Sequence, residues 1–591
     1  MGLNIIGISA HYHDAACCLL RDGALVCAVE EERLSRVKHD PRLPWRAFRS
    51  CLEQGGITLP DVDCVAYYED PTKKLARQIW MGLQPDSSPE TRGRIYGRLP
   101  ASLGRVEREI REGLGYEGPI EILDHHLAHA ASSFYYSGFD EAAILTADGV
   151  GEWATTTFGR AGGSEIELFE EVLFPHSLGL LYSAITAYLG FEVNEGEYKV
   201  MGLAPYGTPR YVEQMMALVA PGEEGQYRLN LEYFDFLGQE RMFSDRLVDL
   251  FGAPPRPPES ELLPFHQDVA RSLQLFLEEV LLDKVSFLHK RVGSRNLCMA
   301  GGVALNCVAN GRILREGPFS NLFVQPAASD AGGCLGAAAV AHVRLTGERP
   351  RQGRLDHMYW GPVSSSQDVA DLLAATSCQA LDFRGRTEEL IEATVDRLAE
   401  GKVVGWFQGR MEFGPRALGA RSILADPRSP EMRDRINALV KMREGFRPFA
   451  PAVLAERAAA HFDLDHPSPF MLETCQVVSP LDLPAITHVD GSARVQTVDP
   501  QASPRFAALL ERFERRTGCP VLLNTSFNLR GEPIVCTPAD AILCFVRSQI
   551  DVLVVEDFLL DREQVPARWS DLAPPLHRPE VAISHQVYTL L

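Results

Sequence analysis

The sequence predicts an α/β protein built from two domains, and three observations support this. Three short apolar runs, separated by a polar loop and a tight turn, open the chain, and the same order recurs from residue 141. Stretches with helical periodicity follow each set of runs. Between residues 344 and 362 the composition becomes rich in Arg, Gly and Pro, which is typical of a linker. We therefore expect one domain over residues 1–350 and a second over residues 351–591.

Each set of apolar runs predicts three strands. Asn4–Ser9 is a β-branched run suited to a buried strand. A second apolar run ends at Leu20, and Asp22-Gly23 predicts a hairpin turn into a third. In the repeat, apolar runs lie on both sides of Asp148-Gly149, and another ends at Glu170-Glu171. The chain is therefore expected to contain the same three-stranded beginning twice.

The elements between and after these strands complete the first domain. Residues 265–292 carry apolar side chains at the spacing of an amphipathic helix and lead into an apolar strand at 296–300. The glycines that end this strand would let backbone N–H groups approach a phosphate. This layout is that of the actin-like ATPase fold, although a fold analogy does not establish function, and most Gly-Gly pairs are only turns. The nucleotide-binding candidates in this domain are Gly301, Gly302 and Asn306.

Composition excludes several classes of partner. The chain of 591 residues is 46% hydrophobic and has a formal net charge of −21, so the phosphate backbone of a nucleic acid would be repelled. The longest apolar stretch, residues 178–191, is too short to cross a bilayer. Thirteen scattered cysteines without a disulfide framework indicate reduced thiols. We expect a cytoplasmic protein with no nucleic-acid or membrane partner.

Two histidines and two aspartates form a candidate metal site. On a helix, His125 and His129 project from one face. Asp148 follows an apolar strand, and Asp330 lies in a Gly-rich loop that opens a helix of small residues. Such a set suits Fe(II), Mn(II) or Zn(II) better than Mg(II) alone. The alternatives are a histidine pair that only covers a helix and an Asp330 that only caps one.

His13-Asp14, directly after the first strand, is a candidate general base with its orienting carboxylate. The alternative is that Asp14 only forms a hydrogen bond in the turn.

The second domain contains a local concentration of basic residues. Guanidinium groups bind phosphate oxygens through paired hydrogen bonds, so this region suits a phosphorylated substrate and ATP. The alternative is a solvated basic face paired with neighbouring carboxylates. Further on, a buried strand at residues 520–523 is expected to lead into a polar loop over 524–528. The candidate ligand-binding residues are Arg416, Arg421, Lys441, Arg447, Arg494, Asn524 and Ser526.

Several of these motifs together resemble one family. His125-x-x-x-His129 with Asp148, the run from Glu197 to Gly207, and Asp330 within residues 326–333 are similar to the amino-terminal domain of the O-carbamoyltransferases that modify antibiotics and nodulation factors. That domain is similar to the metalloprotein of the tRNA threonylcarbamoylation machinery, in which a Glu usually stands where this chain has Leu127. The departure fits the O-carbamoyltransferases better.

The second half of the chain resembles the same family. Residues 413–422, 443–451 and 524–528 are similar to its carboxy-terminal domain, whose fold is similar to that of the YrdC/Sua5 proteins that make carbamoyl-adenylates. The resemblance implies a duplicated actin-like (ASKHA, Kae1-like) domain followed by an α+β YrdC-like domain.

The resemblance also implies an activity. It would be the ATP-dependent transfer of the carbamoyl group of carbamoyl phosphate, through carbamoyl-AMP, to a hydroxyl group of a small-molecule acceptor. His13, Asp14 and Lys199 would act in the transfer, and the metal would be Fe(II) first, with Mn(II) or Zn(II) as alternatives and Mg(II) accompanying ATP. A homodimer is a further expected partnership. The competing functions are a metal-dependent small-molecule kinase or ATPase of the same fold and a subunit of a tRNA-modifying complex.

Overall fold

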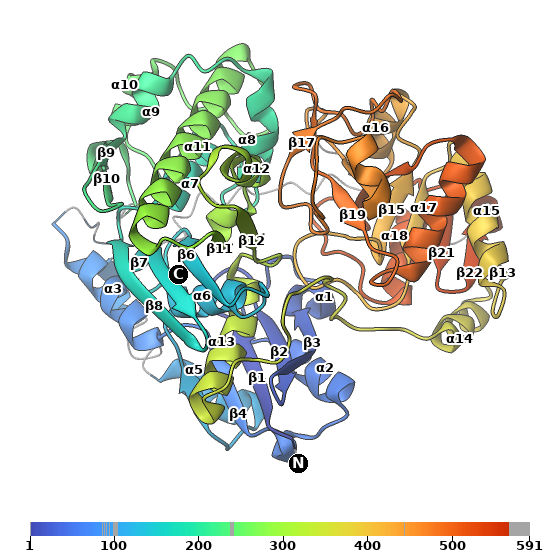
Figure 1. Cartoon of the computed structure of the whole chain (residues 1–591), viewed down its shortest axis with the longest axis horizontal. Coiled ribbons are helices and arrows are strands. Elements are labelled where there is room, and N and C mark those ends of the chain that lie inside the picture. The colour runs from blue at the N-terminus through green and yellow to red at the C-terminus, as the bar shows by residue number, and fades with distance from the viewer. Residues whose placement is uncertain are drawn as a thin grey trace. The chain divides into compact units, whose positions relative to one another are not determined.

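The computed structural model describes residues 2–565 except 86, 88, 90, 91, 94, 98–103, 237–240, 442 and 443. For Leu439 and Lys441 it describes the backbone but not the side chain. The described chain forms two compact units (Figure 1). The first unit contains the residues up to Glu31 and His39–Leu355. The second begins its main part at Asp356, a few residues after the predicted boundary, and also includes Glu32–Lys38. The sequence offered no sign that this short segment belongs to the second unit.

The first unit contains two five-stranded sheets with the same strand order. In one, the order is β3-β2-β1-β4-β5, and in the other it is β8-β7-β6-β11-β12. In both sheets the first three strands are antiparallel, and the two later strands run parallel to the first. This repetition confirms the duplicated actin-like fold. The strands are β1 (Asn4–Ser9), β2 (Ala16–Arg21), β3 (Ala24–Glu30), β4 (Cys64–Tyr67), β5 (Ile120–Ile122), β6 (Glu141–Ala147), β7 (Ala154–Gly162), β8 (Glu165–Leu173), β11 (Asn296–Ala300) and β12 (Asn321–Val324).

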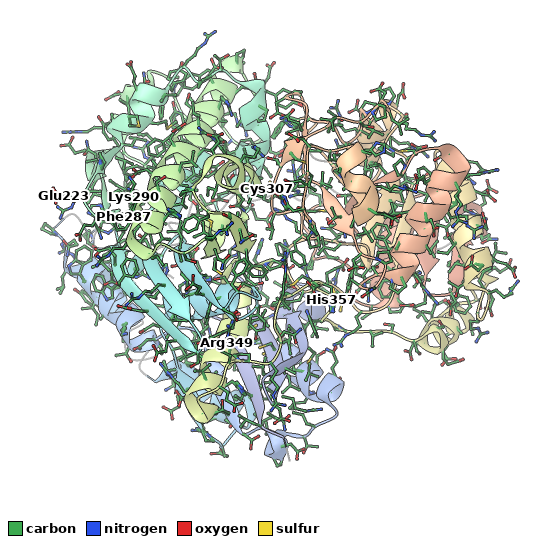
Figure 2. The ribbon with its side chains drawn as sticks, viewed as in Figure 1. Glu223, Phe287, Lys290, Cys307, Arg349 and His357 are labelled. Carbon is green, nitrogen blue, oxygen red and sulfur yellow. The ribbon has the colours of Figure 1, made fainter. Side chains whose placement is uncertain are left out.

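Helices cover these sheets. The long helix α11 packs against β6 and β7, where the ring of Phe287, labelled in Figure 2, contacts Phe158 edge-on. The pair β9 (Val219–Pro221) and β10 (Tyr227–Leu229) forms a separate ribbon. The helices are α1 (Glu31–Ser35), α2 (Trp45–Gly55), α3 (Pro71–Leu83), α5 (Arg105–Arg108), α6 (His125–Phe134), α7 (Leu178–Tyr188), α8 (Glu197–Leu203), α9 (Val212–Ala217), α10 (Asp245–Phe251), α11 (Pro264–Val292), α12 (Cys307–Glu316) and α13 (Asp330–Thr346).

Helix α13 is the element that positions the candidate site. It packs against α6 and against β1. Gly336 makes the contact with α6 possible, because a Cβ there would lie 1.8 Å from the carbonyl oxygen of Ala128. The N-cap of α13 is Ser329, and Asp330 is its first helical residue. Asp330 is therefore not the cap, and that alternative is wrong. The helix also continues to Thr346, so the predicted linker begins a few residues later than Arg344.

The second unit is built on an eight-stranded mixed sheet with the order β13-β22-β21-β14-β15-β20-β16-β19, flanked by helices that pack on it. Its fully buried core includes Trp406. The strands are β13 (Leu381–Asp382), β14 (Val404–Phe407), β15 (Arg421–Ala425), β16 (Ala450–Leu454), β19 (Gln496–Val498), β20 (Val521–Ser526), β21 (Val552–Val555) and β22 (Phe558–Asp561), with the pair β17 (Cys475–Gln476) and β18 (Ser492–Ala493) apart. The helices are α14 (Ser366–Thr376), α15 (Thr387–Ala399), α16 (Glu431–Ile436), α17 (Pro504–Thr517) and α18 (Pro538–Arg547).

One local prediction in this unit is wrong. Residues 524–526 were expected to form a loop after a strand, but β20 continues through Ser526. These residues pair with Ser422, Ile423 and Leu424 of β15, so ladder hydrogen bonds replace the expected turn. Polar side chains are tolerated there because strand pairing satisfies the backbone whatever the side chain is.

Within the described residues no helix combines the length and the apolar character that crossing a membrane requires. All thirteen cysteines lie in the described part of the chain, where they are buried and form no disulfide.

Candidate active site

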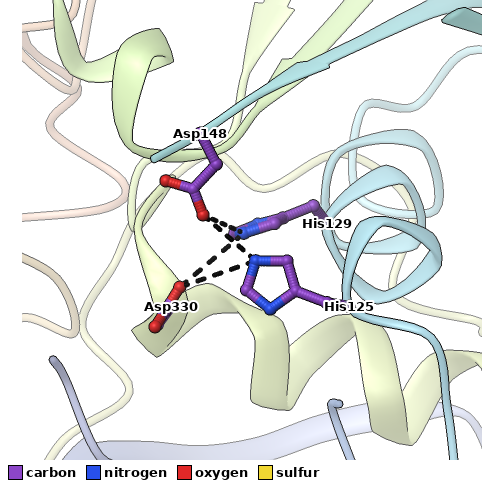
Figure 3. Close-up of side chains that lie close together, drawn as sticks. All are labelled: His125, His129, Asp148 and Asp330. Atoms are coloured by element: carbon purple, nitrogen blue, oxygen red, sulfur yellow. Dashed lines mark hydrogen bonds and ion pairs between the residues drawn. The ribbon is translucent and has the colours of Figure 1, made fainter. Parts of the chain in front are cut away.

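The four predicted metal ligands come together in the first unit (Figure 3). His125 begins α6, and His129 follows one turn later on the same face. Asp148 follows directly after β6, and Asp330 begins α13. All four side chains are buried, and their ligand atoms lie within 4.8 Å of one another.

Both imidazoles point at the same carboxylate oxygen. Nε2 of His125 lies 3.0 Å and Nε2 of His129 3.3 Å from Oδ2 of Asp148. Oδ1 of Asp330 lies 3.8 Å and 3.9 Å from the same two nitrogens. Two nitrogens and two oxygens therefore converge on one small volume. His126 does not take part, because its two ring nitrogens contact Thr146 and the carbonyl oxygen of Ala154.

The backbone around Asp148 holds this arrangement. The N–H groups of Gly149 and Gly302 lie 2.8 Å and 3.0 Å from Oδ1 of Asp148 and donate hydrogen bonds to it. Gly301 has a φ of +92°, and a Cβ there would lie 2.2 Å from the carbonyl oxygen of Ala147. Only glycine fits such a position. The two glycines predicted to bind a nucleotide thus orient a candidate metal ligand, and their nucleotide role stays a prediction.

Two further carboxylate contacts were missed in the sequence. Glu152 accepts hydrogen bonds of 2.8 Å from the backbone N–H groups of His125 and Asp70, so it satisfies the first turn of α6. Tyr68 donates a hydrogen bond of 3.2 Å to Oδ2 of Asp330. Neither residue belongs to a recognisable motif, and only the folded chain brings them to the cluster.

The electrostatics of the cluster favour a bound cation. Burial lowers the pKa of His125, but the hydrogen bond that His125 donates to Asp148 and the charge of Asp330 raise it more, to about 9. Burial and the charge of Asp148 raise the pKa of Asp330 to about 7. Without a metal the site must therefore take up protons to offset its buried carboxylates. The donor set of two imidazoles and two carboxylates fits a divalent first-row transition ion.

A second cluster surrounds the candidate base. Nδ1 of His13 lies 3.0 Å from Oδ1 of Asp14, as expected for a base and its orienting carboxylate. The same oxygen lies 2.8 Å from Nδ1 of His39, and Nε2 of His39 lies 2.7 Å from Oε1 of Glu195. His39 and Glu195 were not predicted, because they are distant in sequence and belong to no motif.

The remaining candidates of the first unit are Lys199, on α8, and Asn306, at the N-terminus of α12. Lys199, on α8, is half-buried, and its Nζ lies 5.8 Å from the centroid of the Phe191 ring. Asn306 caps α12 by accepting from the N–H of Ala309, and its side chain also bonds to Gln274. The catalytic role of Lys199 and the nucleotide role of Asn306 stay predictions.

In the second unit, Arg421 is fully buried, unlike an arginine that simply faces solvent. Its guanidinium donates to the carbonyl oxygens of Gln408, Gly409 and Ala420 and lies 3.5 Å from the centroid of the Phe407 ring. These hydrogen bonds tie together the chain just after β14 and just before β15. Binding of a ligand by Arg421 stays a prediction.

Glu412 organises the loop that carries Arg416. Its Oε1 accepts backbone hydrogen bonds from Leu418 and Ala420 at 2.7 Å and from Arg421 at 3.2 Å. A carboxylate whose oxygen accepts three backbone hydrogen bonds fixes the shape of a loop and does not merely screen a basic surface. This favours a formed loop over the alternative of a solvated basic face.

The other candidates of the second unit lie at several places. Arg447 pairs with Glu444 at 3.6 Å, Asn524 donates to Gln496 at 2.8 Å, and Ser526 donates to Asn528 at 2.7 Å. Arg416 and Arg494 are half-buried. The side chain of Lys441 lies outside the described part of the chain. Phosphate binding by these residues stays a prediction.

The comparisons with known proteins agree with the geometry. Residues 4–84 and 94–339 match the family model for the carbamoyltransferase N-terminus, and residues 395–562 match that for the carbamoyltransferase C-terminus. An uncharacterized protein of Synechocystis sp. is 45% identical over 96% of this chain and 98% of its own. The nodulation protein NolNO of Sinorhizobium fredii is 40% identical over 97% of this chain and 82% of its own, and NolO of Bradyrhizobium diazoefficiens is 41% identical over 79% and 83%.

Among solved structures, HypF of T. kodakarensis is similar with a TM-score of 0.31 and 14% identity, over 58% of this chain and 48% of that one. A likeness this weak carries no argument, and the fold assignment rests on the strand order of the two sheets. The two family models together span most of the chain, and the three relatives align over 79% to 97% of it. The chain belongs to the carbamoyltransferase family.

Proposed function

We propose that the chain is an ATP-dependent O-carbamoyltransferase that moves the carbamoyl group of carbamoyl phosphate, through carbamoyl-AMP, to a hydroxyl group of a small-molecule acceptor. One observation carries the proposal. Ser329, the residue before the metal-ligand candidate Asp330, donates a hydrogen bond of 2.9 Å to Oδ2 of Asp14. The candidate general base with its carboxylate, His13 and Asp14, and the candidate metal site are thus joined through one hydrogen bond, so one substrate could contact both.

The second unit would make the activated donor. Water hydrolyses carbamoyl phosphate to carbamate and phosphate, and a carbamate oxygen then attacks the α-phosphorus of ATP. The bond between the α- and β-phosphates breaks, and pyrophosphate leaves with Mg(II). The basic and hydroxyl side chains assigned to this step hold the phosphate oxygens in place. They are Arg416, Lys441, Arg447, Arg494 and Ser526.

The first unit would complete the transfer. His13 takes the proton of the acceptor hydroxyl, the acceptor oxygen attacks the carbamoyl carbon, and AMP leaves. Asp14 orients the His13 ring, and Lys199 offsets charge on the departing AMP. His125, His129, Asp148 and Asp330 would hold a divalent ion, Fe(II) first, which when bound supplies positive charge next to the reacting groups.

A product screen tests the activity. The protein is incubated with ATP, carbamoyl phosphate and a panel of hydroxylated metabolites, and the products are analysed by mass spectrometry. We expect AMP, pyrophosphate and an acceptor heavier by one carbamoyl group. Release of ADP in place of AMP would instead support the kinase alternative.

Two variants test the division of labour. His125→Ala should keep pyrophosphate release and lose carbamoyl transfer, because it removes a ligand in the first unit only. Arg416→Ala should abolish pyrophosphate release. The proposed division is wrong if His125→Ala stops pyrophosphate release while Arg416→Ala leaves it at the wild-type rate.

A further inference from the structure

His39 lies between two carboxylates. Its Nδ1 is 2.8 Å from Oδ1 of Asp14, and its Nε2 is 2.7 Å from Oε1 of Glu195. Both distances are those of charge-assisted hydrogen bonds. Each nitrogen of the ring therefore has an acidic partner in the folded chain.

The partners determine the state of the ring. An ionised carboxylate has no proton to donate, so a histidine nitrogen that contacts one must itself be the donor. Asp14 is ionised: burial raises the pKa of this carboxyl, but the charges and hydrogen bonds of His13 and His39 lower it more, to well below its ordinary value. Its other oxygen accepts a hydrogen bond of 2.9 Å from Ser329. With acceptors at both nitrogens, His39 carries two ring protons and a positive charge.

The backbone at His39 is consistent with a ring held in place. The φ angle of this residue is +51°, in the left-handed region that few residues other than glycine adopt. Residues in such conformations persist where the surrounding contacts determine them. At His39, the two carboxylate contacts provide such a constraint.

We propose that His39 is a permanent imidazolium that positions the candidate base His13 through Asp14. This inference rests on the proposed function of His13. Because Oδ1 of Asp14 accepts from His39, it stays ionised and oriented to accept also from Nδ1 of His13, 3.0 Å away. His13 then carries its proton on Nδ1 and presents the lone pair of Nε2 to an acceptor hydroxyl.

The ring of His39 also lies close to that of His13. The centroids of the two rings lie 4.0 Å apart, at an angle of 36°. The charged ring of His39 therefore lies directly beside the ring of the candidate base.

A metal ion is the competing occupant, because His13, Asp14 and His39 also have the spacing of a metal site. A metal would need a lone pair on a ring nitrogen of His39. Both nitrogens are instead at hydrogen-bond distance from carboxylate oxygens. A bound metal and a doubly protonated His39 are therefore alternatives that the state of the ring nitrogens distinguishes.

The first experiment measures the ring directly and does not depend on activity. The full chain is labelled with ¹⁵N-histidine, and the His39→Gln spectrum identifies the signals of His39. We expect both ring nitrogens of His39 to show the chemical shift of protonated nitrogen at pH 7.5, without substrate. One unprotonated nitrogen, or one whose shift moves on adding Mn(II) or Zn(II), would overturn the proposal.

The second experiment separates positioning of the base from a general loss of structure. With ATP and carbamoyl phosphate present, AMP release is compared for water and for hydroxylamine as nucleophile. The nitrogen of hydroxylamine attacks the carbamoyl carbon without a base, giving hydroxyurea and AMP and releasing a proton to solvent. His39→Gln should lower kcat with water by roughly 100-fold, as a misplaced catalytic group does, with the KM for ATP unchanged. Its rate with hydroxylamine should stay within about twofold of wild type.

Rescue and a control complete this test. In His39→Gly, added imidazole should restore much of the rate with water, because its cation can occupy the same place between the carboxylates. His289→Gln, on α11 and outside the cluster, should behave as wild type. Equal loss of both rates, without rescue, would show a structural role and overturn the proposal. If the wild type releases no AMP at all, the proposed function fails, while the ¹⁵N result still decides the charge of His39.

Discussion

Two histidine–carboxylate clusters lie in the first unit, and they differ in what offsets their charge. In the metal cluster, His125 and His129 direct Nε2 at one oxygen of Asp148, and both rings are buried. In the base cluster, His13 and His39 direct Nδ1 at one oxygen of Asp14 and are only half-buried. The residue types and their convergence on one oxygen are the same.

The two clusters differ at the ring nitrogens that do not face the shared carboxylate oxygen. The buried Nδ1 atoms of His125 and His129 have no hydrogen-bond partner, and Asp330 adds a second buried carboxylate. Buried carboxylates without matching cations are costly, which favours a bound cation in this cluster. The second nitrogen of His39 has Glu195 as its partner, so a protonated ring already offsets the charge. We therefore propose that similar residues hold a metal ion in one place and form a protonated support in the other.

The largest expected effect comes from Asp148→Asn. It removes the charged oxygen on which both imidazoles converge. Metal content, measured by elemental analysis of the purified protein, should fall from about one ion per chain to near zero. Loss of a residue that only hydrogen-bonds to a ligand costs up to roughly 100-fold in metal affinity, and loss of the ligand itself should cost more. The matched variant Asp14→Asn should keep its metal. Equal metal loss in both would show that the two clusters do not differ as described.

The next effect is the pH dependence of metal affinity. Metal must displace the protons held on His125, with a pKa of about 9, and on Asp330, with a pKa of about 7. Affinity should therefore rise with pH, by about tenfold per pH unit between pH 6 and 8 from His125, with an added contribution below pH 7 from Asp330. Isothermal titration at several pH values measures this. An affinity that is flat from pH 6 to 8 would contradict the protonated state of the metal-free site.

Gly301→Ala should disturb the metal cluster alone. The added Cβ would lie 2.2 Å from the carbonyl oxygen of Ala147, in a backbone with φ at +92°. We expect a loss of roughly 1–3 kcal/mol in the free energy of unfolding from strain, together with weaker metal binding because Asp148 shifts. Gly293→Ala is the matched control, since its φ is +75° but its Cβ would meet open space. If both variants lose the same stability and bind metal equally, the turn does not hold Asp148.

The smallest effect is expected from Ser329→Ala. This variant removes the hydrogen bond of 2.9 Å to Asp14 that joins the two clusters. A hydrogen bond to a charged group contributes about 1.5–3 kcal/mol, so transfer should slow by roughly tenfold or more. Metal content should not change. A loss of metal in this variant would mean that the two clusters respond as one.

Much of the architecture was predictable because it depends on local patterns. The strand Asn4–Ser9 and the strand at 296–300 have the predicted bounds, since a β-branched or apolar run between polar turns leaves little choice. The helical spacing of His125 and His129 is likewise a local property. Asn524 to Ser526 were misassigned because polar residues suggest a loop, while strand pairing with β15 overrides that preference.

The sequence by itself determined the duplicated fold, the four metal-ligand candidates and the pairing of His13 with Asp14, because each is written in spacing along a short stretch. Only the tertiary structure decided which residues complete the sites. Glu195 reaches His39 from 156 positions away, and Ser329 reaches Asp14 from 315. The physical reason is that a hydrogen bond depends on distance in space, and a spacing pattern carries no information about segments that fold together from opposite ends of a domain.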